Sequence, residues 1–210
     1  MSKPELSILD VWPDLGKINA LVKNIMVQMR IKDPVEAIRR VNANEWVVKE
    51  LRKLPLLTPG ATISVRGISR FVAADHVKEI AFGWVHPNFK QFFFSKTEEN
   101  IPDSVITMYR LEKASKDVSI MTALGNYVEI SLAHFFGLLM AQSTGETGHL
   151  LVNGYNNIAY IRGTDANIWS IYAVWSTDDG WHVGPHLVGE SSFRDWSDGD
   201  QVISYKSNIL

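Results

Sequence analysis

The stretch NIWSIYAVWSTDDGWHVGPH, residues 167–186, decides how the C-terminal half of this 210-residue chain folds. Side chains alternate between the two faces of a β-strand. Over residues 168–175 this alternation gives one entirely apolar face, made of Trp169, Ile171, Ala173 and Trp175. Burying one tryptophan contributes roughly 2–3 kcal/mol, so we expect this face to lie in the core. The opposite face, which carries Ser170 and Tyr172, is mixed and is expected to be wetter.

Working outward from this stretch, short extended runs alternate with turn sequences such as NGYN, GTDAN, TDDG and SDGD from residue 150 onward. An apolar helix is expected before them, at roughly residues 127–142. Helices come first and strands are grouped late, which favours an α+β fold. We therefore predict a helical N-terminal lead, a mixed region, and a central apolar helix packed on a C-terminal antiparallel β-meander.

Helical signals dominate the start of the chain. Residues 15–29 form an amphipathic helical pattern, and Asp33, Pro34 and Glu36 mark the start of a second helix that runs to about Val41. The segment KLPLLTPGA, at residues 53–61, has the proline and glycine content of a linker. We predict a helical N-terminal segment over 1–56 and an α+β domain over 57–210.

Between the linker and the apolar helix, the chain predicts a mixture of both element types. The expected strands lie at 61–68 and 104–113, and the expected helices lie at 70–80 and at 86–96, the latter opening with Pro87. The run EWVVKEL, after the second helix, is expected to be extended because Val47 and Val48 are β-branched.

Composition excludes several classes of protein. With 46% hydrophobic and 21% charged residues, the chain reads as a folded soluble protein. It has no cysteine, which excludes disulfides, thiolate zinc sites and cysteine nucleophiles. The most apolar run, residues 130–141, is shorter than the roughly 20 residues of a membrane span, and no signal peptide is recognised at the N-terminus. A cytoplasmic protein without membrane attachment is expected.

Charge is unevenly distributed. Residues 1–70 carry twelve Lys and Arg against seven Asp and Glu, whereas the net charge of the whole chain is −2. A nucleic-acid partner for this basic third is one hypothesis, and a solvated helix face interleaved with glutamates is the alternative. The nucleic-acid hypothesis requires one shared surface for Lys17, Lys23, Arg30, Arg39, Arg40, Arg52 and Lys53.

No metal or cofactor site is predicted. His182 and His186 have the i, i+4 spacing of helical zinc ligands, but Gly184 and Pro185 between them exclude a helix. Four residues of strand span about 13 Å, too far for two ligands of one zinc ion. The acidic segment 195–201 resembles a calcium loop, yet aligning its glycine places Arg194 where a carboxylate is required, so a turn is expected.

The chain carries none of the common catalytic motifs, such as GxSxG, HExxH, GxGxxG or a P-loop. A non-catalytic binding or interaction module for a protein or small ligand is therefore the first hypothesis, against ordinary surface aromatic residues. Its candidate contacts are Tyr155, Tyr160, Arg162, Tyr172, His182 and His186.

The alternative is a hydrolase-type enzyme near the C-terminal hairpins. His182 or His186 would be the base, Arg162 would hold an anionic group, and the orienting carboxylate would be one of Asp178, Asp179 and Glu190. A homodimer, formed through a sheet edge or the first helix, is compatible with every one of these hypotheses.

Three stretches carry a resemblance to a known group of proteins. They are NFKQFFFSKTEENIPDSVITMYRLEKAS, AQSTGETGHLLVNGYNNIAYIRGTDANIWSIYAVW, and the pair GWHVGPHLV and WSDGDQVIS, with VNANEW just upstream of the resembling region. From about residue 58 onward the chain resembles a recurrent domain of uncharacterised proteins from uncultivated, small-genome bacteria of the candidate phyla. The resemblance implies a modular domain of the bacterial cytoplasm and assigns no role to any residue.

Overall fold

A computed structural model of the chain describes residues 23, 26–27, 30, 32–42, 55–189 and 195–206. The chain divides into two units, Met1–Lys53 and Leu54–Leu210, and each is described by itself.

In the first unit, the longest described helix is α3 (Pro34–Asn42). It begins where the sequence predicts, because Asp33 Oδ1 accepts the backbone N–H of Val35 at 2.9 Å. Glu36 pairs with Arg39 one turn later, at 2.8 Å. Of the predicted first helix only residues 23 and 26–27 are described, and these are helical. The run predicted to be extended, EWVVKEL, lies outside the described residues.

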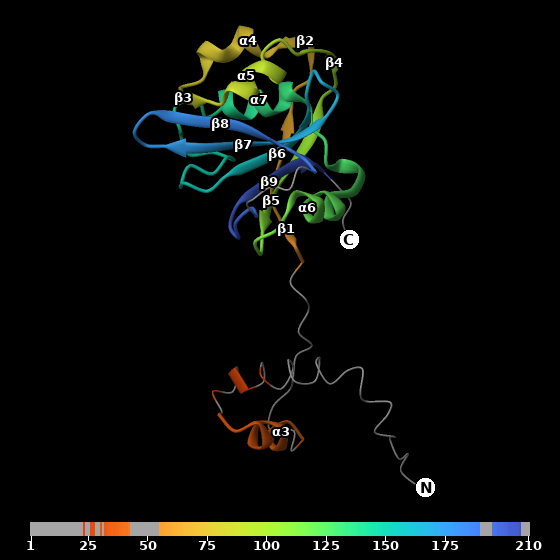
Figure 1. The fold of residues 1–210 in the computed structure, drawn as a ribbon, viewed down its shortest axis with the longest axis vertical. Coiled ribbons are helices and arrows are strands. Elements are labelled where there is room, and N and C mark those ends of the chain that lie inside the picture. The colour runs from red at the N-terminus through yellow and green to blue at the C-terminus, as the bar shows by residue number, and fades with distance from the viewer. Residues whose placement is uncertain are drawn as a thin grey trace. The chain divides into compact units, whose positions relative to one another are not determined.

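The second unit is an α+β fold built on a mixed seven-stranded sheet (Figure 1). Its order is β1-β5-β9-β6-β7-β8-β3, and β2 and β4 form a separate two-stranded sheet. The strands are β1 (Leu57–Val65), β2 (Ile68–Val72), β3 (Phe82–Val85), β4 (Thr97–Ile101), β5 (Ser104–Leu111), β6 (Asn157–Arg162), β7 (Ile168–Ser176), β8 (Gly180–Leu187) and β9 (Gln201–Tyr205). The helices are α4 (Ala73–His76), α5 (Pro87–Phe93), α6 (Asp117–Leu124) and α7 (Leu132–Met140), with 3₁₀ turns at Val77–Glu79 and Gly125–Tyr127.

The predicted C-terminal meander had five extended runs, at 150–152, 157–162, 168–175, 181–187 and 201–205. The first is not a strand, the next three are neighbouring strands as predicted, and the last is a strand with a different place in the sheet. β6, β7 and β8 pair antiparallel in sequence order. β9, however, does not follow β8 in the sheet: it enters between β5 and β6, antiparallel to β5 and parallel to β6. β3 likewise pairs parallel with β8, at the far edge. Turn sequences reveal hairpins between neighbouring strands, but they carry no information on pairs formed across long connections.

Strand β7 confirms the alternation predicted for residues 168–175. Trp169, Ile171 and Ala173 are buried on one face, and Trp175 packs against the same cluster. Trp181 on β8 is fully buried beside them, with its ring 5.4 Å from that of Trp175. Its indole Nε1 donates to the backbone carbonyl of Gln142 at 2.8 Å, which ties β8 to the end of α7.

The two faces of the large sheet are covered differently, as Figure 1 shows. On one face, α4, α5, α7 and the β2–β4 pair enclose the larger core, in which all residues of α7 except Gly137 and Met140 are buried. On the other face the short helix α6, which the sequence analysis did not predict, packs on β5, β6 and β9. The predicted apolar helix is thus shorter than expected, because a 3₁₀ turn and an extended segment precede Leu132.

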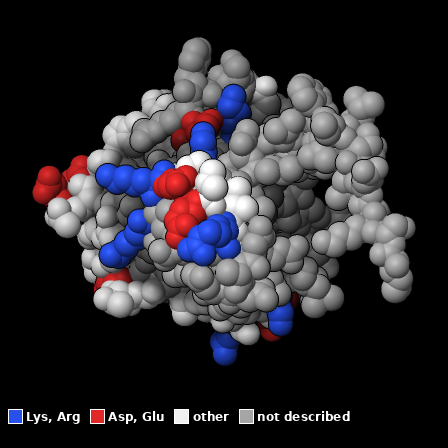
Figure 2. All heavy atoms as spheres, turned by 90° about the horizontal axis from the view of Figure 1, so that it is seen from below, with Lys and Arg blue, Asp and Glu red and all other residues white. Residues whose placement is uncertain are grey.

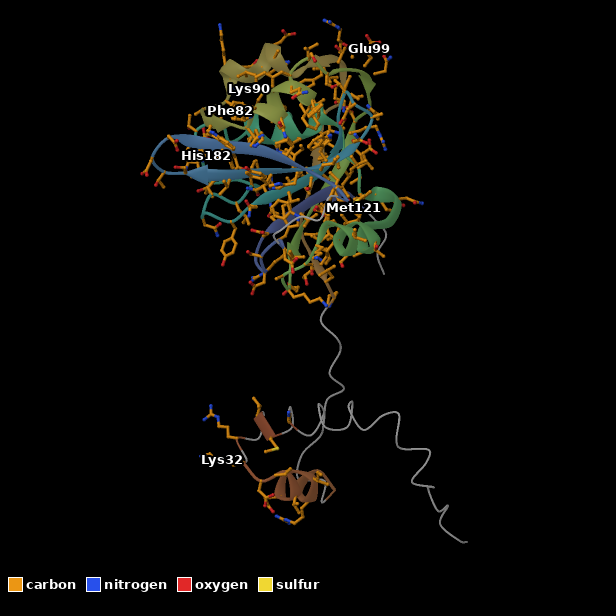
Figure 3. The ribbon with its side chains drawn as sticks, in the orientation of Figure 1. Lys32, Phe82, Lys90, Glu99, Met121 and His182 are labelled. Atoms are coloured by element: carbon orange, nitrogen blue, oxygen red, sulfur yellow. The ribbon has the colours of Figure 1, made fainter. Side chains whose placement is uncertain are left out.

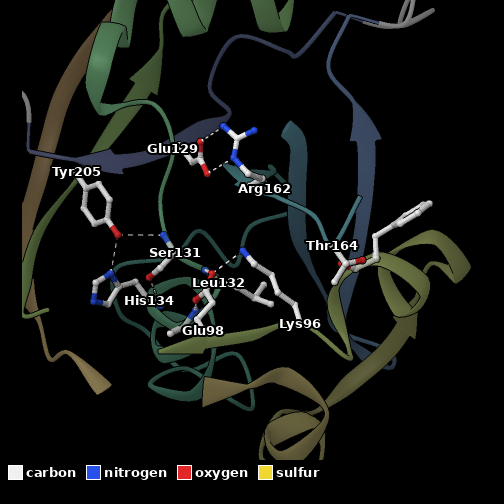
Figure 4. Close-up of polar contacts among 11 residues, drawn as sticks. Lys96, Glu98, Glu129, Ser131, Leu132, His134, Arg162, Thr164 and Tyr205 are labelled. Atoms are coloured by element: carbon white, nitrogen blue, oxygen red, sulfur yellow. Dashed lines mark hydrogen bonds and ion pairs between the residues drawn. The ribbon is translucent and has the colours of Figure 1, made fainter. Parts of the chain in front are cut away.

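Hydrogen bonds at the start of α7 fix the helix on the small sheet (Figure 4). Ser131 Oγ accepts the N–H of His134, and the Glu98 carboxylate on β4 accepts the N–H groups of Leu132 and Ala133 at 3.0 and 2.8 Å. A carboxylate here satisfies N–H groups that have no partner inside the helix and favours the positive end of its dipole. Lys96 pairs with the same carboxylate at 2.6 Å.

His134, on α7, is a buried imidazole with one satisfied nitrogen. Its Nδ1 lies 3.0 Å from the Tyr205 hydroxyl, which also accepts the N–H of Ser131, whereas Nε2 has no hydrogen-bond partner of good geometry among the described residues. Burial lowers the pKa of His134 below its ordinary value of 6.5, against the opposing influence of the Pro102 carbonyl and nearby carboxylates. The folded state therefore disfavours a proton that the unfolded chain accepts.

We expect this imidazole to make the protein less stable as the pH falls. Below about 6.5 the unfolded state takes up a proton that folded His134 refuses, so the free energy of unfolding drops by up to about 1.4 kcal/mol for each unit by which the pKa is lowered. Thermal unfolding between pH 7.5 and 5.0 should show a decline that is smaller in His134→Gln. The exposed His149→Gln is the control and should keep the wild-type slope; equal slopes in all three proteins would contradict the assignment.

Candidate functional site

A hollow of about 760 Å³ opens on the part of the second sheet face that adjoins the area covered by α6. Seven aromatic residues line it, and we call it the aromatic hollow. One of them, Trp169 on β7, has its ring in the core on the other side of the sheet, stacked on Phe92. The six rings on the side of the hollow come from β3 and the residue after it, from β7 and β8, and from the segment before β9: Trp84, His86, Tyr172, His182, His186 and Trp196. Its volume falls in the range of small-molecule sites, roughly 300–1,000 Å³.

The register of the sheet puts these rings on one face. Trp84 on β3 is paired with His182, His182 with Val174 on β7, and Tyr172 with Gly184 on β8. Figure 3 shows His182 on β8, near the hairpin end. Because His182 and His186 are four residues apart on one strand, they stand about 13 Å apart at the two ends of the hollow.

Each end of the hollow has its own aromatic group. At one end, Trp84 lies 5.4 Å from the His86 ring, edge to face, and 6.2 Å from the His182 ring. At the other end, Tyr172 stacks on His186 at 5.2 Å, and Trp196 stands 5.6 Å from His186 and 6.3 Å from Tyr172. Stacked and edge-to-face pairs at these distances stabilise one another, so the rings form fixed walls.

His86 is positioned by local chain chemistry. It is the residue before Pro87, which suits an extended conformation followed by a helix start. Its Nδ1 accepts the N–H of Asn88 at 3.1 Å and caps α5, and its own N–H donates to Val183 on β8. The ring is therefore held at the mouth of the hollow by a helix and a strand together.

Trp196 is positioned by a buried carboxylate. Asp117, the first residue of α6, is 5% exposed and accepts three hydrogen bonds. The donors are the indole of Trp196 at 2.6 Å, the hydroxyl of Tyr160 at 2.9 Å and the hydroxyl of Ser170 at 3.3 Å. A backbone bridge between Ser115 and Trp196 adds a second attachment. Burial, together with the Asp117 carboxylate, raises the pKa of Tyr160 above its ordinary range, so this hydroxyl stays a donor.

A glycine makes room for the central ring. A Cβ atom on Gly184 would come within 2.4 Å of the Tyr172 hydroxyl, so the ring lies directly over this residue of β8. Partial burial raises the pKa of Tyr172. Its hydroxyl therefore remains neutral in ordinary buffers and presents a polar tip inside an otherwise apolar wall.

His182 has a charged partner beside the hollow. Its Nε2 lies 2.7 Å from Asp179 Oδ1 in the β7–β8 turn. Hydrogen bonds from Ser176 and from His182 lower the pKa of Asp179, so the carboxylate is ionised near neutral pH. Because half of the Asp179 side chain is exposed, solvent screens this pair and its contribution to stability is small.

The structure brings together three of the six predicted contact residues, Tyr172, His182 and His186, in the aromatic hollow. Arg162 lies elsewhere and is held by Glu129 through two contacts, at 3.1 and 2.7 Å. Tyr155 is 43% exposed and packs over Gly199, outside the hollow lining.

Tyr160 and Ser170 need a correction. Tyr160 was predicted to contact a ligand and Ser170 to lie on the wetter face of the sheet, but both are 0% exposed. The physical reason is α6, whose Ile120 and Leu124 cover that part of the face. A direct contact between Tyr160 and a ligand is therefore excluded, although its hydroxyl supports Asp117 from beneath.

Sequence reasoning missed Trp84, His86 and Trp196. Trp84 sits on a four-residue strand whose partner β8 is nearly a hundred residues away in the chain. Trp196 lies in a segment read as a turn. The sequence offered one indication of this site, because Trp84 and Trp196 both lie outside the strands expected in the core. Isolated large aromatic residues near turns often lie at binding surfaces.

No set of three or more His, Asp or Glu side chains suited to a metal ion occurs within the described ranges. Nor does any helix there combine the length and apolar composition that a membrane span requires. Comparison of the chain with protein-family models, with curated proteins and with solved structures gave no match. Function has to be argued from the geometry of the hollow.

The position of Tyr172 can be tested through Gly184. We expect Gly184→Ala to lower the free energy of unfolding by about 1–3 kcal/mol, because the new methyl group forces the Tyr172 ring from its place. Gly137→Ala in α7 is the matched control, since its Cβ meets no atom within 4 Å and alanine favours a helix, which should add about 0.5–1 kcal/mol. Urea denaturation measures both; an unchanged Gly184→Ala would show that Tyr172 does not lie over this residue.

Proposed function

We propose that this protein is a non-catalytic binding module whose ligand enters the aromatic hollow. The observation that carries the proposal is the meeting of six aromatic rings, from four separate segments of the chain, around a cavity of about 760 Å³. Rigid aromatic side chains offer a large contact area at low cost in conformational entropy, and they dominate the energetics of most recognition surfaces. The exposure of Trp84 supports a role in binding. Its side chain is 41% exposed, so a large aromatic surface is available to a ligand.

The polar groups around the hollow support binding more than catalysis. Asp117 accepts three hydrogen bonds from within the protein, and Asp200 accepts three more, two from Asn156 and one from Ser197. These carboxylates are engaged in holding the walls, whereas a general acid or base needs a free site facing the reacting atom. A pre-organised hollow with satisfied supports lowers the entropic cost of binding.

One observation favours a second candidate, the hydrolase-type enzyme. His182 lines the hollow and has a carboxylate, Asp179, within hydrogen-bond distance, which is the arrangement of an oriented base. The contact uses Nε2, the ring nitrogen farther from the backbone, and leaves Nδ1 to take a proton. This candidate predicts that a bound ligand is turned over and that His182→Gln abolishes turnover while binding persists.

Nucleic-acid binding through the basic N-terminal third stays a separate hypothesis. Of its seven residues, Lys17, Arg52 and Lys53 lie outside the described part, as does the side chain of Arg40. Arg39, which is described, pairs with Glu36. Figure 2 shows Lys and Arg side chains in blue together with Asp and Glu side chains in red among the described residues of the face that it draws.

A ligand screen with two variants tests the proposed function. A compound at 100 times its dissociation constant stabilises the protein by about 2.7 kcal/mol, a clear shift in thermal unfolding. We expect Trp84→Leu to weaken any such binding by tenfold or more, because a large exposed ring is lost from the wall.

Tyr155→Leu is the matched control, since Tyr155 is exposed to the same degree but lies outside the hollow. It should bind as the wild type does. A ligand lost in Tyr155→Leu and kept in Trp84→Leu would place the binding surface elsewhere on the protein.

A further inference from the structure

The charged residues in the described lining of the aromatic hollow are acidic. The lining includes three carboxylates, those of Asp117, Asp195 and Asp200, and no Lys or Arg. From this lining, and resting on the proposed function, we infer that the ligand is an organic cation, specifically an alkylated ammonium group. Three features of the hollow support this choice: its rings, the charge of its two buried carboxylates, and the few free acceptor positions that these two carboxylates have left.

The rings suit a cation. Trp84, Tyr172 and Trp196 line the hollow, and the faces of tryptophan and tyrosine rings carry the negative part of the aromatic quadrupole. Tryptophan gives the strongest attraction, and one stands at each end of the hollow. Cages of such rings are the common means by which proteins hold quaternary ammonium groups.

The buried carboxylates add net negative charge. Asp117 and Asp200 are 5% and 1% exposed, and the hydrogen bonds that each accepts come from neutral donors. Within the described ranges neither forms an ion pair with Lys, Arg or His. Buried charges are favourable mainly when a charge of opposite sign is near, and a low-dielectric surrounding strengthens that interaction. A cation entering the hollow gains from both carboxylates, whereas a phosphate group would be repelled.

The same hydrogen bonds argue for an alkylated ammonium group and against a bare one. A primary ammonium brings three N–H donors that must all be satisfied when it leaves water. The two buried carboxylates, Asp117 and Asp200, already accept three bonds each, out of about four that a carboxylate offers, and the third, Asp195, is exposed to water. Val174, Pro185 and Leu187 offer apolar contact beside the polar lining residues Asn88, Asn156 and Ser197. An ammonium carrying methyl groups makes no such demand and fills an aromatic, apolar space by contact.

The test compares choline with 3,3-dimethylbutan-1-ol, in which a carbon atom replaces the nitrogen, so that shape is kept and charge removed. Both are titrated into the full chain by calorimetry at low salt, with intrinsic tryptophan fluorescence as a second readout. We expect choline to bind at least tenfold more tightly than the alcohol, and Trp84→Leu to weaken choline binding at least fivefold. Tyr155→Leu should bind choline as the wild type does.

Equal binding of the two compounds would overturn the inference but leave the proposed function standing. The same holds if neither compound binds while another compound of the screen binds in a Trp84-dependent manner. Choline binding that Trp84→Leu does not weaken would place the cation outside the hollow and also overturn it. If no compound of either experiment binds, the proposed function fails together with the inference. Thermal unfolding of each variant confirms that Trp84→Leu is folded, as the exposure of Trp84 leads us to expect.

Discussion

The carboxylate of Asp117 is the constraint on which the second face of the sheet depends. It sits at the start of α6, where a negative charge favours the helix, and it accepts donors from β6, β7 and the segment before β9. These donors come from parts of the chain that are 43 to 79 residues away. A buried carboxylate without them would be strongly destabilising. The helix, the sheet and the Trp196 wall are therefore held in one arrangement by a single side chain.

The unequal cover of the two faces follows from the two helices. α7 is apolar around nearly its whole circumference, so it must be enclosed by the sheet on one side and by other elements on the other. α6 is shorter and covers the β5, β9 and β6 part alone. Beside it, β7, β8 and β3 bear aromatic side chains that line a hollow instead of meeting a helix. The site thus arises where the sheet extends beyond its cover.

This origin explains the character of the hollow. Residues of β7 and β8 line it, its walls include rings fixed by stacking and capping, and its two buried carboxylates also serve as structural acceptors. Sites on strands and helices are more rigid than sites on loops, so little conformational freedom is lost when a ligand enters. Rigidity, aromatic surface and negative charge together support the proposed binding of an organic cation over chemistry that needs mobile acid and base groups.

The sequence by itself determined whatever depends on neighbours in the chain. Alternation in residues 168–175 gave β7 and its buried face, Asp33 and Pro34 gave the start of α3, and Pro87 gave α5, because periodicity and capping act over a few residues. Tertiary structure alone decided the order of the strands and the parallel pairing of β9 with β6. It also decided the burial of Tyr160 under α6 and the presence of Trp84, Trp196 and Tyr172 in one hollow. Such contacts join segments that are distant in the chain. They depend on the apolar surface that the whole fold buries, and a pattern of neighbouring residues does not predict that quantity.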